Sequence, residues 1–414
     1  MAQSPLQTEI LIVGAGVLGT GCAWRLARAG RRVVLVDKGD VGREASGSNA
    51  GGIQLVLTAL DLLPYELEAR RLWESLGDEL DADLGLVACG GLRVAETEAD
   101  LSAMAELVPA QRALGLDVRI LSRHETARLV PALAPEIAGA IYCAQDGFAA
   151  SRVLPMAMAQ ASARSGAVVL PFHPVHAIAR RSSGFLVRAG DMEIEADVVV
   201  NAAGAWAGRI AAMAGVALPV APDIQQVHVT DPLPPLLPHI YSHAAKNLTI
   251  KQFTQGNVAI GGGRTGLGGP DCALQQPTLV STACNLADAV RLFPALRDAQ
   301  LLRSWAGVEG RSPDQLPYLG PAAPQGDFFV LACSKCGFSL NPILTLLLSE
   351  LILHGRTALP IAPFTPTRYA DRAGDASLFA WLERKRSEQL RDVPRLPRRT
   401  GADSPREGAV THGS

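Results

Sequence analysis

The chain has 414 residues, of which 48% are hydrophobic and 19% charged, and its formal net charge is −2 at pH 7. This length allows one large or two interleaved domains, and the charge balance argues against a nucleic-acid partner bound through net charge. No run reaches the roughly 18 apolar residues of a membrane span, and no signal-peptide pattern opens the chain. The seven cysteines are scattered and do not suggest a disulfide framework. We expect a protein of the reducing cytoplasm.

The first segment has the pattern of a dinucleotide-binding βαβ unit. An apolar strand over 10–13 leads into a glycine-rich turn at 14–19 (GAGVLG), and a helix follows as far as Gly30. A second apolar strand over 33–36 ends at Asp37. A strand, a glycine turn, a helix and a strand ending in an acid together form the whole signature, which is more specific than the glycines alone.

Each part of this unit has a physical task. Gly14 permits the tight turn, Gly16 lets the backbone approach a pyrophosphate, and Gly19 allows close packing of helix and strand. The helix N-terminus attracts phosphate through its unpaired N–H groups and its dipole, and Asp37 would accept hydrogen bonds from a ribose. We expect a dinucleotide site here, the alternative being a glycine-rich turn without a ligand.

Two further stretches of small residues follow strands of the same region. Residues 42–53 (GREASGSNAGGI) come after the second strand, and residues 202–206 (AAGAW) follow an apolar strand over 193–201. Small residues let a backbone lie against a ligand, and ligands of such folds collect at the carboxyl ends of the strands. We favour a binding role for the first stretch over a flexible loop.

The remaining elements alternate in type. The sequence predicts helices over 61–80, 100–114, 122–129, 153–165, 278–293 and 342–354, and strands over 91–94, 168–170, 175–181, 184–189, 249–253, 257–262 and 328–332. Residues 305–320 read as a turn-laden segment and residues 333–340 as a turn. Cys333 and Cys336 form a CxxC pattern; a metal site and a redox pair are the alternatives, but without a second pair two small, half-buried residues are favoured.

Several motifs together resemble the D-amino-acid-oxidase-like flavoproteins, a family that includes glycine oxidase and sarcosine oxidase. They are VGAGVLG at 13–19, the acid at Asp37, EASGSNAGGI at 44–53, VVNAAGAW at 199–206, NLTIKQFTQGNVAIGGG at 247–263, SPDQLPYLG at 312–320 and CGFSLNP at 336–342. The resemblance implies an α/β fold in which a Rossmann-like, glutathione-reductase-like FAD-binding domain is interleaved with a smaller substrate domain on an antiparallel sheet.

This resemblance also implies the domain limits. The FAD-binding domain would comprise residues 8–83, 145–218 and 300–370, and the substrate domain residues 84–144 and 219–299. Residues 371–414 would be a charged extension with a disordered end.

The resemblance assigns cofactor contacts residue by residue. Gly14, Gly16 and Gly19 would hold the pyrophosphate, Asp37 the ribose, and the turn at 337–340 would lie by the flavin C2=O and N1, where a helix N-terminus stabilises negative charge. The expected FAD-binding residues are Gly14, Ala15, Gly16, Val17, Leu18, Gly19, Asp37, Lys38, Ala45, Ser46, Asn49, Gly51, Gly52, Ile53, Val175, Ala203, Gly204, Trp206, Gly307, Gly337, Phe338, Ser339 and Leu340.

Two departures from the family pattern concern the substrate. Glu309 stands where glycine-oxidase-like members carry an arginine for the substrate carboxylate, and Lys335-Cys336 replaces a histidine before the glycine. These features look more like the β subunits of heteromeric dehydrogenases of opines, proline or D-hydroxyproline. Such subunits work with an α subunit and a small iron–sulfur subunit, and their complexes also bind FMN between subunits.

The implied chemistry is oxidation of a C–N bond by hydride transfer to flavin N5, which needs positioning more than a strong base. Lys335 and Glu309 are the candidate catalytic residues, and Arg311 and Lys251 are weaker candidates for carboxylate binding. The histidines (His173, His176, His228, His239 and His243) are scattered and are expected to be structural. A stand-alone oxidase that forms hydrogen peroxide and a non-catalytic flavin-binding subunit stay open as alternatives.

Overall fold

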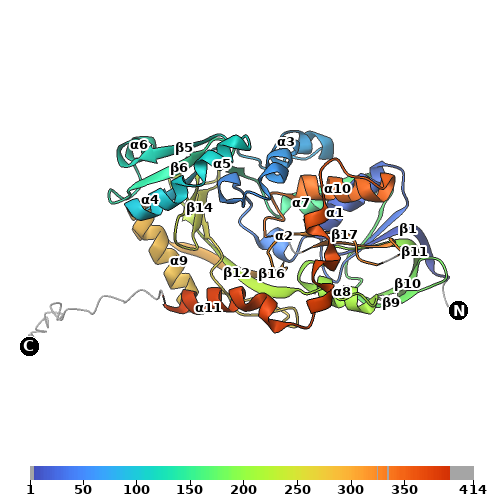
Figure 1. Cartoon of the computed structure of the whole chain (residues 1–414). Helices are drawn as coiled ribbons and strands as arrows, with labels where there is room; N and C mark the ends of the chain where they lie inside the picture. Colours follow the sequence, from blue (N-terminus) through green and yellow to red (C-terminus); the bar gives the residue numbers. More distant parts are fainter. Residues whose placement is uncertain (1–3, 324, 333–334, 392–414) are drawn as a thin grey trace, which may run out of the picture.

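The computed structural model describes residues 4–323, 325–332 and 335–391. Two large sheets form two sides of the molecule, and the edge of the second sheet formed by β12 and β16 lies near α2 (Figure 1). Cys333 lies outside the described residues, so the CxxC pattern stays a sequence observation. No described helix is long and apolar enough to cross a membrane.

The first sheet confirms the expected βαβ unit. Its strand order is β17-β18-β11-β1-β2-β8, and the β9–β10 hairpin extends from β11. The strands from β18 to β8 run parallel, whereas β17 is antiparallel. The bounds are β1 (Leu6–Val13), β2 (Val33–Val36), β8 (Val168–Leu170), β9 (Val175–Arg180), β10 (Phe185–Ala189), β11 (Met192–Asn201), β17 (Tyr318–Pro321) and β18 (Phe328–Ala332).

Both faces of this sheet are covered. Ile10 and Ile12 of β1 belong to a core shared with helices α1 (Val17–Arg28) and α10 (Asn341–His354). Leu11 and Val13 point to the other face, because successive strand residues alternate, and they pack with the β9–β10 hairpin and α8 (Ala207–Met213). Helices α3 (Leu63–Leu80) and α7 (Val153–Arg164) add to the first layer.

The second sheet is mostly antiparallel, as expected. Its order is β16-β12-β15-β14-β13-β4-β6-β5, and only the β13–β4 pair is parallel. It has eight strands, as many as the first sheet, and so is not smaller in strand number. The bounds are β4 (Gly91–Ala95), β5 (Val118–Ser122), β6 (Gly139–Cys143), β12 (Ala221–Pro232), β13 (Ile240–His243), β14 (Thr249–Gln252), β15 (Asn257–Gly261) and β16 (Leu301–Arg311).

Helices of the second side and two short elements complete the described fold. The helices are α4 (Glu98–Ala105), α5 (Val108–Ala113), α6 (Arg123–Leu129) and α9 (Leu279–Leu292). Strands β3 (Gly52–Ile53) and β7 (Gly147–Phe148) form a two-stranded sheet, and α2 (Ala45–Ser48) is a single turn. The expected single helix over 100–114 is two helices, because Pro109 at the start of α5 lacks the N–H that a continuous helix would use.

One expectation about the later part of the chain was wrong. Much of the expected turn-laden segment 305–320 belongs to a strand, because β16 pairs along its length with β12. Residues 301–311 therefore belong to the second sheet, whereas residues 300–370 were expected in the FAD-binding domain. The charged extension contains a helix, α11 (Ala380–Arg391), whose Leu382 is buried. The expected disordered end lies outside the described residues.

Candidate active site

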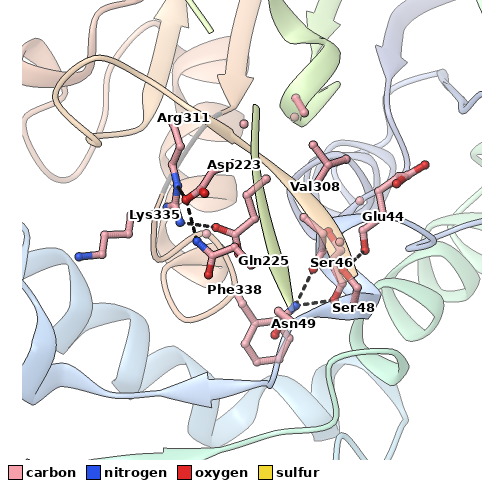
Figure 2. Close-up of a pocket in the computed structure, with 18 of the residues that line it drawn as sticks. Glu44, Ser46, Ser48, Asn49, Asp223, Gln225, Val308, Arg311, Lys335 and Phe338 are labelled. Carbon is pink, nitrogen blue, oxygen red and sulfur yellow. Dashed lines mark hydrogen bonds and ion pairs between the residues drawn. The ribbon is translucent and has the colours of Figure 1, made fainter. Parts of the chain in front are cut away.

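A cavity of about 940 Å³ is lined by residues of both sheets. This volume lies near the upper end of the roughly 300–1,000 Å³ that small-molecule sites occupy. Figure 2 shows the small polar residues of the α2 region on one side and a charged cluster around Arg311 on the other. The cavity therefore joins the predicted nucleotide site to a charged wall on the second sheet.

The glycine turn forms one end of this cavity. Gly14 has φ +110°, and a Cβ there would lie 2.5 Å from the carbonyl oxygen of Ala202. A Cβ at Gly19 would meet the carbonyl oxygen of Gly14. Gly16 is the N-cap of α1, and the Val17 N–H donates to Ser46 Oγ at 3.0 Å. The backbone is thus brought close together at a helix N-terminus, which suits a phosphate.

Asp37 directly follows β2 and lies beside this turn. Its Oδ2 accepts a hydrogen bond from the Ala15 N–H at 2.6 Å, and its Oδ1 accepts one from the Gly39 N–H at 2.8 Å. Burial raises the pKa of this carboxyl above its usual value, and the two backbone N–H groups oppose that shift. Each oxygen keeps a second lone pair, so the side chain can also accept from a ribose hydroxyl.

The α2 region lies between the two ends of the cavity. The Asn49 side chain donates to the carbonyl oxygens of Ala45 and Ser46 and accepts from the Gly51 N–H. Gly51 has φ +70°, and a Cβ there would lie 2.1 Å from the Ala149 carbonyl oxygen. The loop is therefore rigid and presents backbone to the cavity.

The structure brings the predicted cofactor residues together. They all line the cavity except Ala15, Gly19, Ile53 and Leu340, which are buried. Val175 and Trp206 lie on the nucleotide side, where Lys38 Nζ is 4.0 Å from the centre of the Trp206 ring. Their contacts with a cofactor stay a prediction.

Helix α10 begins at the cavity. Phe338 and Ser339, just before its first turn, line the wall. Ser339 Oγ donates to Oε1 of the buried Glu66 at 2.7 Å. Burial, reinforced by the charge of Asp146, raises the pKa of Glu66 to about 8, although the Ser339 hydrogen bond opposes the shift. Glu66 is therefore protonated at neutral pH, and the positive end of the α10 dipole is not cancelled by a charge behind it.

A charged cluster forms the opposite wall. Glu309 and Arg311 of β16 pair at 2.6 Å through Oε2 and Nη2, and Arg311 Nε lies 3.2 Å from Oδ2 of Asp223 on β12. The same Asp223 oxygen accepts from Gln225 Nε2 at 2.8 Å (Figure 2). Lys385 of α11 adds a second cation, with Nζ 2.8 Å from Asp223 Oδ2.

The opposite charges in this cluster stabilise one another in their ionised forms. Burial alone would raise the pKa of Asp223, but Lys385 and Arg311 together keep it below its usual range. Burial alone would lower the pKa of Arg311, but the Glu309 and Asp223 carboxylates raise it. Asp223 and Arg311 are therefore both ionised at neutral pH, in agreement with their ion pair.

The two lysines expected near the substrate differ in position. Lys335 lines the cavity but is exposed, and its ammonium points away from Arg311 (Figure 2). Lys251 is buried beneath Gly51, with Nζ 4.2 Å from the Phe148 ring centre and without a hydrogen-bond partner among the described residues. Burial lowers the pKa of Lys251 to about 7.

Other residues of the cavity were missed in the sequence. Asp223, Gln225, Arg93, Trp381 and Lys385 all line it. Lys385 belongs to the charged extension expected over 371–414, and nothing in the local sequence pairs it with Asp223, which lies on β12 far away in the chain.

Two of the histidines that were expected to be structural, His173 and His243, line the cavity. His243 Nδ1 accepts from the N–H groups of Ala245 and Lys246. His228 pairs with Ser304, and burial lowers its pKa to about 4.

These observations fit FAD. The glycine cradle and helix N-terminus suit a pyrophosphate, Asp37 suits a ribose, and the cavity continues from them past Gly51 to the start of α10 and the charged wall. Within the described ranges, no group of three His, Cys, Asp or Glu side chains could hold a metal ion.

Comparisons with known proteins agree with this geometry. The family model described as "FAD dependent oxidoreductase" (DAO) matches residues 9–351. Glycine oxidase of Geobacillus kaustophilus is 32% identical over 376 residues, covering 88% of this chain and 98% of the relative. The B subunit of opine oxidase from Rhizobium meliloti is 28% identical, with the same coverage.

Solved structures show the same fold. The crystal structure of Geobacillus kaustophilus glycine oxidase superposes with a TM-score of 0.81 at 29% identity, over 88% of this chain and 99% of that one. L-proline dehydrogenase from P. horikoshii gives the same TM-score at 24% identity, over 88% and 98% of the two chains.

Proposed function

Because the chain belongs to the DAO family of FAD-dependent oxidoreductases, we propose that it oxidises the C–N bond of a secondary amine or amino acid. The observation that carries this proposal is a single cavity in which the glycine cradle and Asp37 face the Glu309–Arg311–Asp223 cluster. When bound, FAD supplies the hydride acceptor at N5. The substrate class follows the named relatives, which act on glycine and opines.

The residues of the first sheet would hold the cofactor. The turn at 14–19 and the α1 N-terminus bind the pyrophosphate, and Asp37 binds the ribose. Ser46, Asn49, Gly51 and Gly52 lie along the cavity towards the start of α10, whose positive end stabilises negative charge there. Val175 and Trp206 would contact the nucleotide part of FAD, and residues 337–340 would lie by the flavin ring.

The charged wall would hold the substrate. Hydride transfer from an amine requires the neutral amine, and Glu309 is partly exposed to the cavity, where its carboxylate can accept the proton of the substrate ammonium. Arg311 holds that carboxylate through their ion pair. Lys335 at the rim adds a positive charge that favours an anionic substrate.

We further propose that the chain is the β subunit of a heteromeric dehydrogenase, with an α subunit and a small iron–sulfur subunit. The likeness to the B subunits of two opine oxidases and the acid at position 309 support this. On the same resemblance FMN would bind between the subunits, and release of two flavin types from a co-expressed complex tests it. A stand-alone, peroxide-forming oxidase is the second candidate, favoured by the 32% identity to glycine oxidase.

We propose the reducing cytoplasm as the compartment, since Cys22, Cys89, Cys143, Cys272 and Cys336 carry free thiols.

The experiment that tests the function is a substrate screen of the FAD-loaded chain with a dye acceptor, with and without oxygen. Glycine, sarcosine, proline, D-hydroxyproline and an opine are compared, and the products are identified by mass spectrometry. A carbonyl product together with the released amine, or a cyclic imine from proline, is expected. Absence of turnover with every amine would contradict the proposal and leave a non-catalytic flavin-binding subunit.

A further inference from the structure

Helix α11 closes one end of the cavity, beyond the part of the chain that matches the family model. Trp381 and Lys385 of this helix line the cavity. The helix is fixed to the second sheet: Arg386 Nη2 donates to the Pro222 carbonyl oxygen at 2.9 Å, and Gln389 exchanges hydrogen bonds with the Gly263 carbonyl and the Thr265 N–H. It is therefore a wall of the site and not a solvated tail.

Unsatisfied donors gather at this wall. Trp381 Nε1 and Arg311 Nη1 are buried and find no hydrogen-bond partner in the part of the chain that the structure describes. Arg311 is 4% exposed and also lines the cavity. A buried N–H group without an acceptor costs free energy. Two such groups on the wall of one cavity therefore indicate that a bound ligand supplies the acceptors.

Cations and carboxylates are balanced on this wall. Arg311 and Lys385 lie against the two carboxylates of Asp223 and Glu309. The exposed Lys335, whose ammonium points away from Arg311, adds a positive charge only at the rim. Asp223 Oδ2 already accepts from Arg311, Lys385 and Gln225. Its Oδ1 has no partner among the described residues, so an N–H group of the same ligand can be accepted there.

We propose that α11 completes the substrate pocket and that Arg311, Trp381 and Lys385 bind the carboxylate of an amino-acid substrate. This rests on the proposed function and deepens it, because it separates amino acids from plain amines. Arg311 and Lys385 would attract the carboxylate by their positive charge, and the indole N–H of Trp381 would orient it through a hydrogen bond. Asp223 holds both cations in place. In this chain the substrate carboxylate would therefore be bound by Arg311, the next residue on the same face of β16 after Glu309, and by two residues of helix α11.

The test measures binding apart from turnover. The FAD-loaded, full-length protein is titrated with acetate, with succinate and with the uncharged acetamide, and the dissociation constant is read from the change in the flavin absorption spectrum. Both carboxylates are expected to bind and acetamide is not. Equal binding of acetate and acetamide would overturn the proposal.

Three variants locate the site. Trp381→Phe keeps an aromatic ring and removes the indole N–H, and it should weaken acetate binding about fivefold. Lys385→Met should weaken it about tenfold or more, since hydrogen bonds to charged groups are the stronger ones. Arg384→Met, on the exposed neighbouring residue, is the matched control and should stay within twofold. Retained FAD content and an unchanged melting temperature show that each variant is folded.

The outcomes separate this inference from the proposed function. If Trp381→Phe and Lys385→Met both bind acetate as the wild type does while amines still reduce the flavin, the carboxylate site is wrong and the function stands. If the variants weaken acetate binding but no amine reduces the flavin, the function is wrong and the site stands. If Lys385→Met does not fold, the Trp381→Phe result decides.

Discussion

Glu309 and Arg311 lie two residues apart on β16 and pair through Oε2 and Nη2 at 2.6 Å. Side chains at i and i+2 share one face of a strand, so both lie on the cavity side, the acid 24% and the base 5% exposed. The acid that stands where the family resemblance leads one to expect arginine is thus accompanied by an arginine. Its carboxylate is a fixed group of the cavity wall.

Glu309→Gln should lower kcat/KM for the amine substrate by about tenfold or more, or about 1.4 kcal/mol. The amide cannot take the ammonium proton, and it leaves Arg311 with one fewer anion. Steady-state kinetics with a dye acceptor measures the effect. Glu383→Gln on the exposed side of α11 is the control, and a near-wild-type value for Glu309→Gln would place this residue in the fold and not in the reaction.

Gly16→Val should give a folded but colourless protein. A Cβ at Gly16 lies 2.8 Å from Ser46 Oγ, and a branched side chain there fills the space at the α1 N-terminus that the pyrophosphate needs. Gly374→Val, at a position with no neighbour within 4 Å, is the control and should stay yellow. Circular dichroism and the flavin released by heat are the measurements; stoichiometric FAD in Gly16→Val would disprove the assigned cradle.

Glu66→Gln should flatten the pH dependence of stability. The folded pKa of Glu66 is about 8 against an ordinary 4.5, so the folded state holds a proton that the unfolded state has lost. The stabilising contribution is complete below pH 4.5 and is lost as the pH rises towards 8, at up to about 1.4 kcal/mol per pH unit. Urea unfolding from pH 5 to 8 measures it, with Glu74→Gln, at an exposed position of the same helix, as control. An unchanged slope in Glu66→Gln would contradict the assigned protonation state.

Lys251→Met should stabilise the protein, most strongly below pH 7. The pKa of Lys251 in the folded state is about 7, against an ordinary 10.5, because burial disfavours the charged form. The neutral lysine therefore costs no stability above pH 10.5, and the cost grows as the pH falls and is complete once the pH has passed 7. Methionine fits between Phe148 and Phe253, which flank the ammonium, without a buried charge. Lys246→Met, which removes an ion-paired lysine, should instead destabilise. Thermal melts at pH 6 and pH 9 decide, and a lower melting temperature for Lys251→Met at pH 6 would contradict this.

The sequence was sufficient for the nucleotide side of the site and insufficient for the charged wall. Gly14, Gly16, Gly19 and Asp37 lie within one local unit, whose spacing alone predicts the strand, turn and helix. Asp223 and Lys385 meet only because α11 packs onto β12, and no local pattern encodes a contact between segments so far apart. The charged residues at 384–386 give no sign that Leu382 and Gln389 on the same helix are buried.

The proposed partner predicts how the flavin returns to its oxidised state. After anaerobic bleaching by an amine, the isolated chain should reoxidise in air slowly compared with turnover on an artificial acceptor, because its electrons are passed to another subunit. Stopped-flow absorbance measures both rates. Reoxidation in air as fast as catalysis would exclude the dehydrogenase subunit and leave the stand-alone oxidase.

The central claim is that this cavity oxidises amines with FAD, and anaerobic mixing of the FAD-loaded chain with an amino acid tests it most directly. The visible flavin absorbance should fall within seconds with the amine, with one equivalent of oxidised product for each flavin, and the matching 2-hydroxy acid should leave the flavin oxidised. A flavin that dithionite reduces but that no amine bleaches, or one bleached by the hydroxy acid alone, would contradict the account.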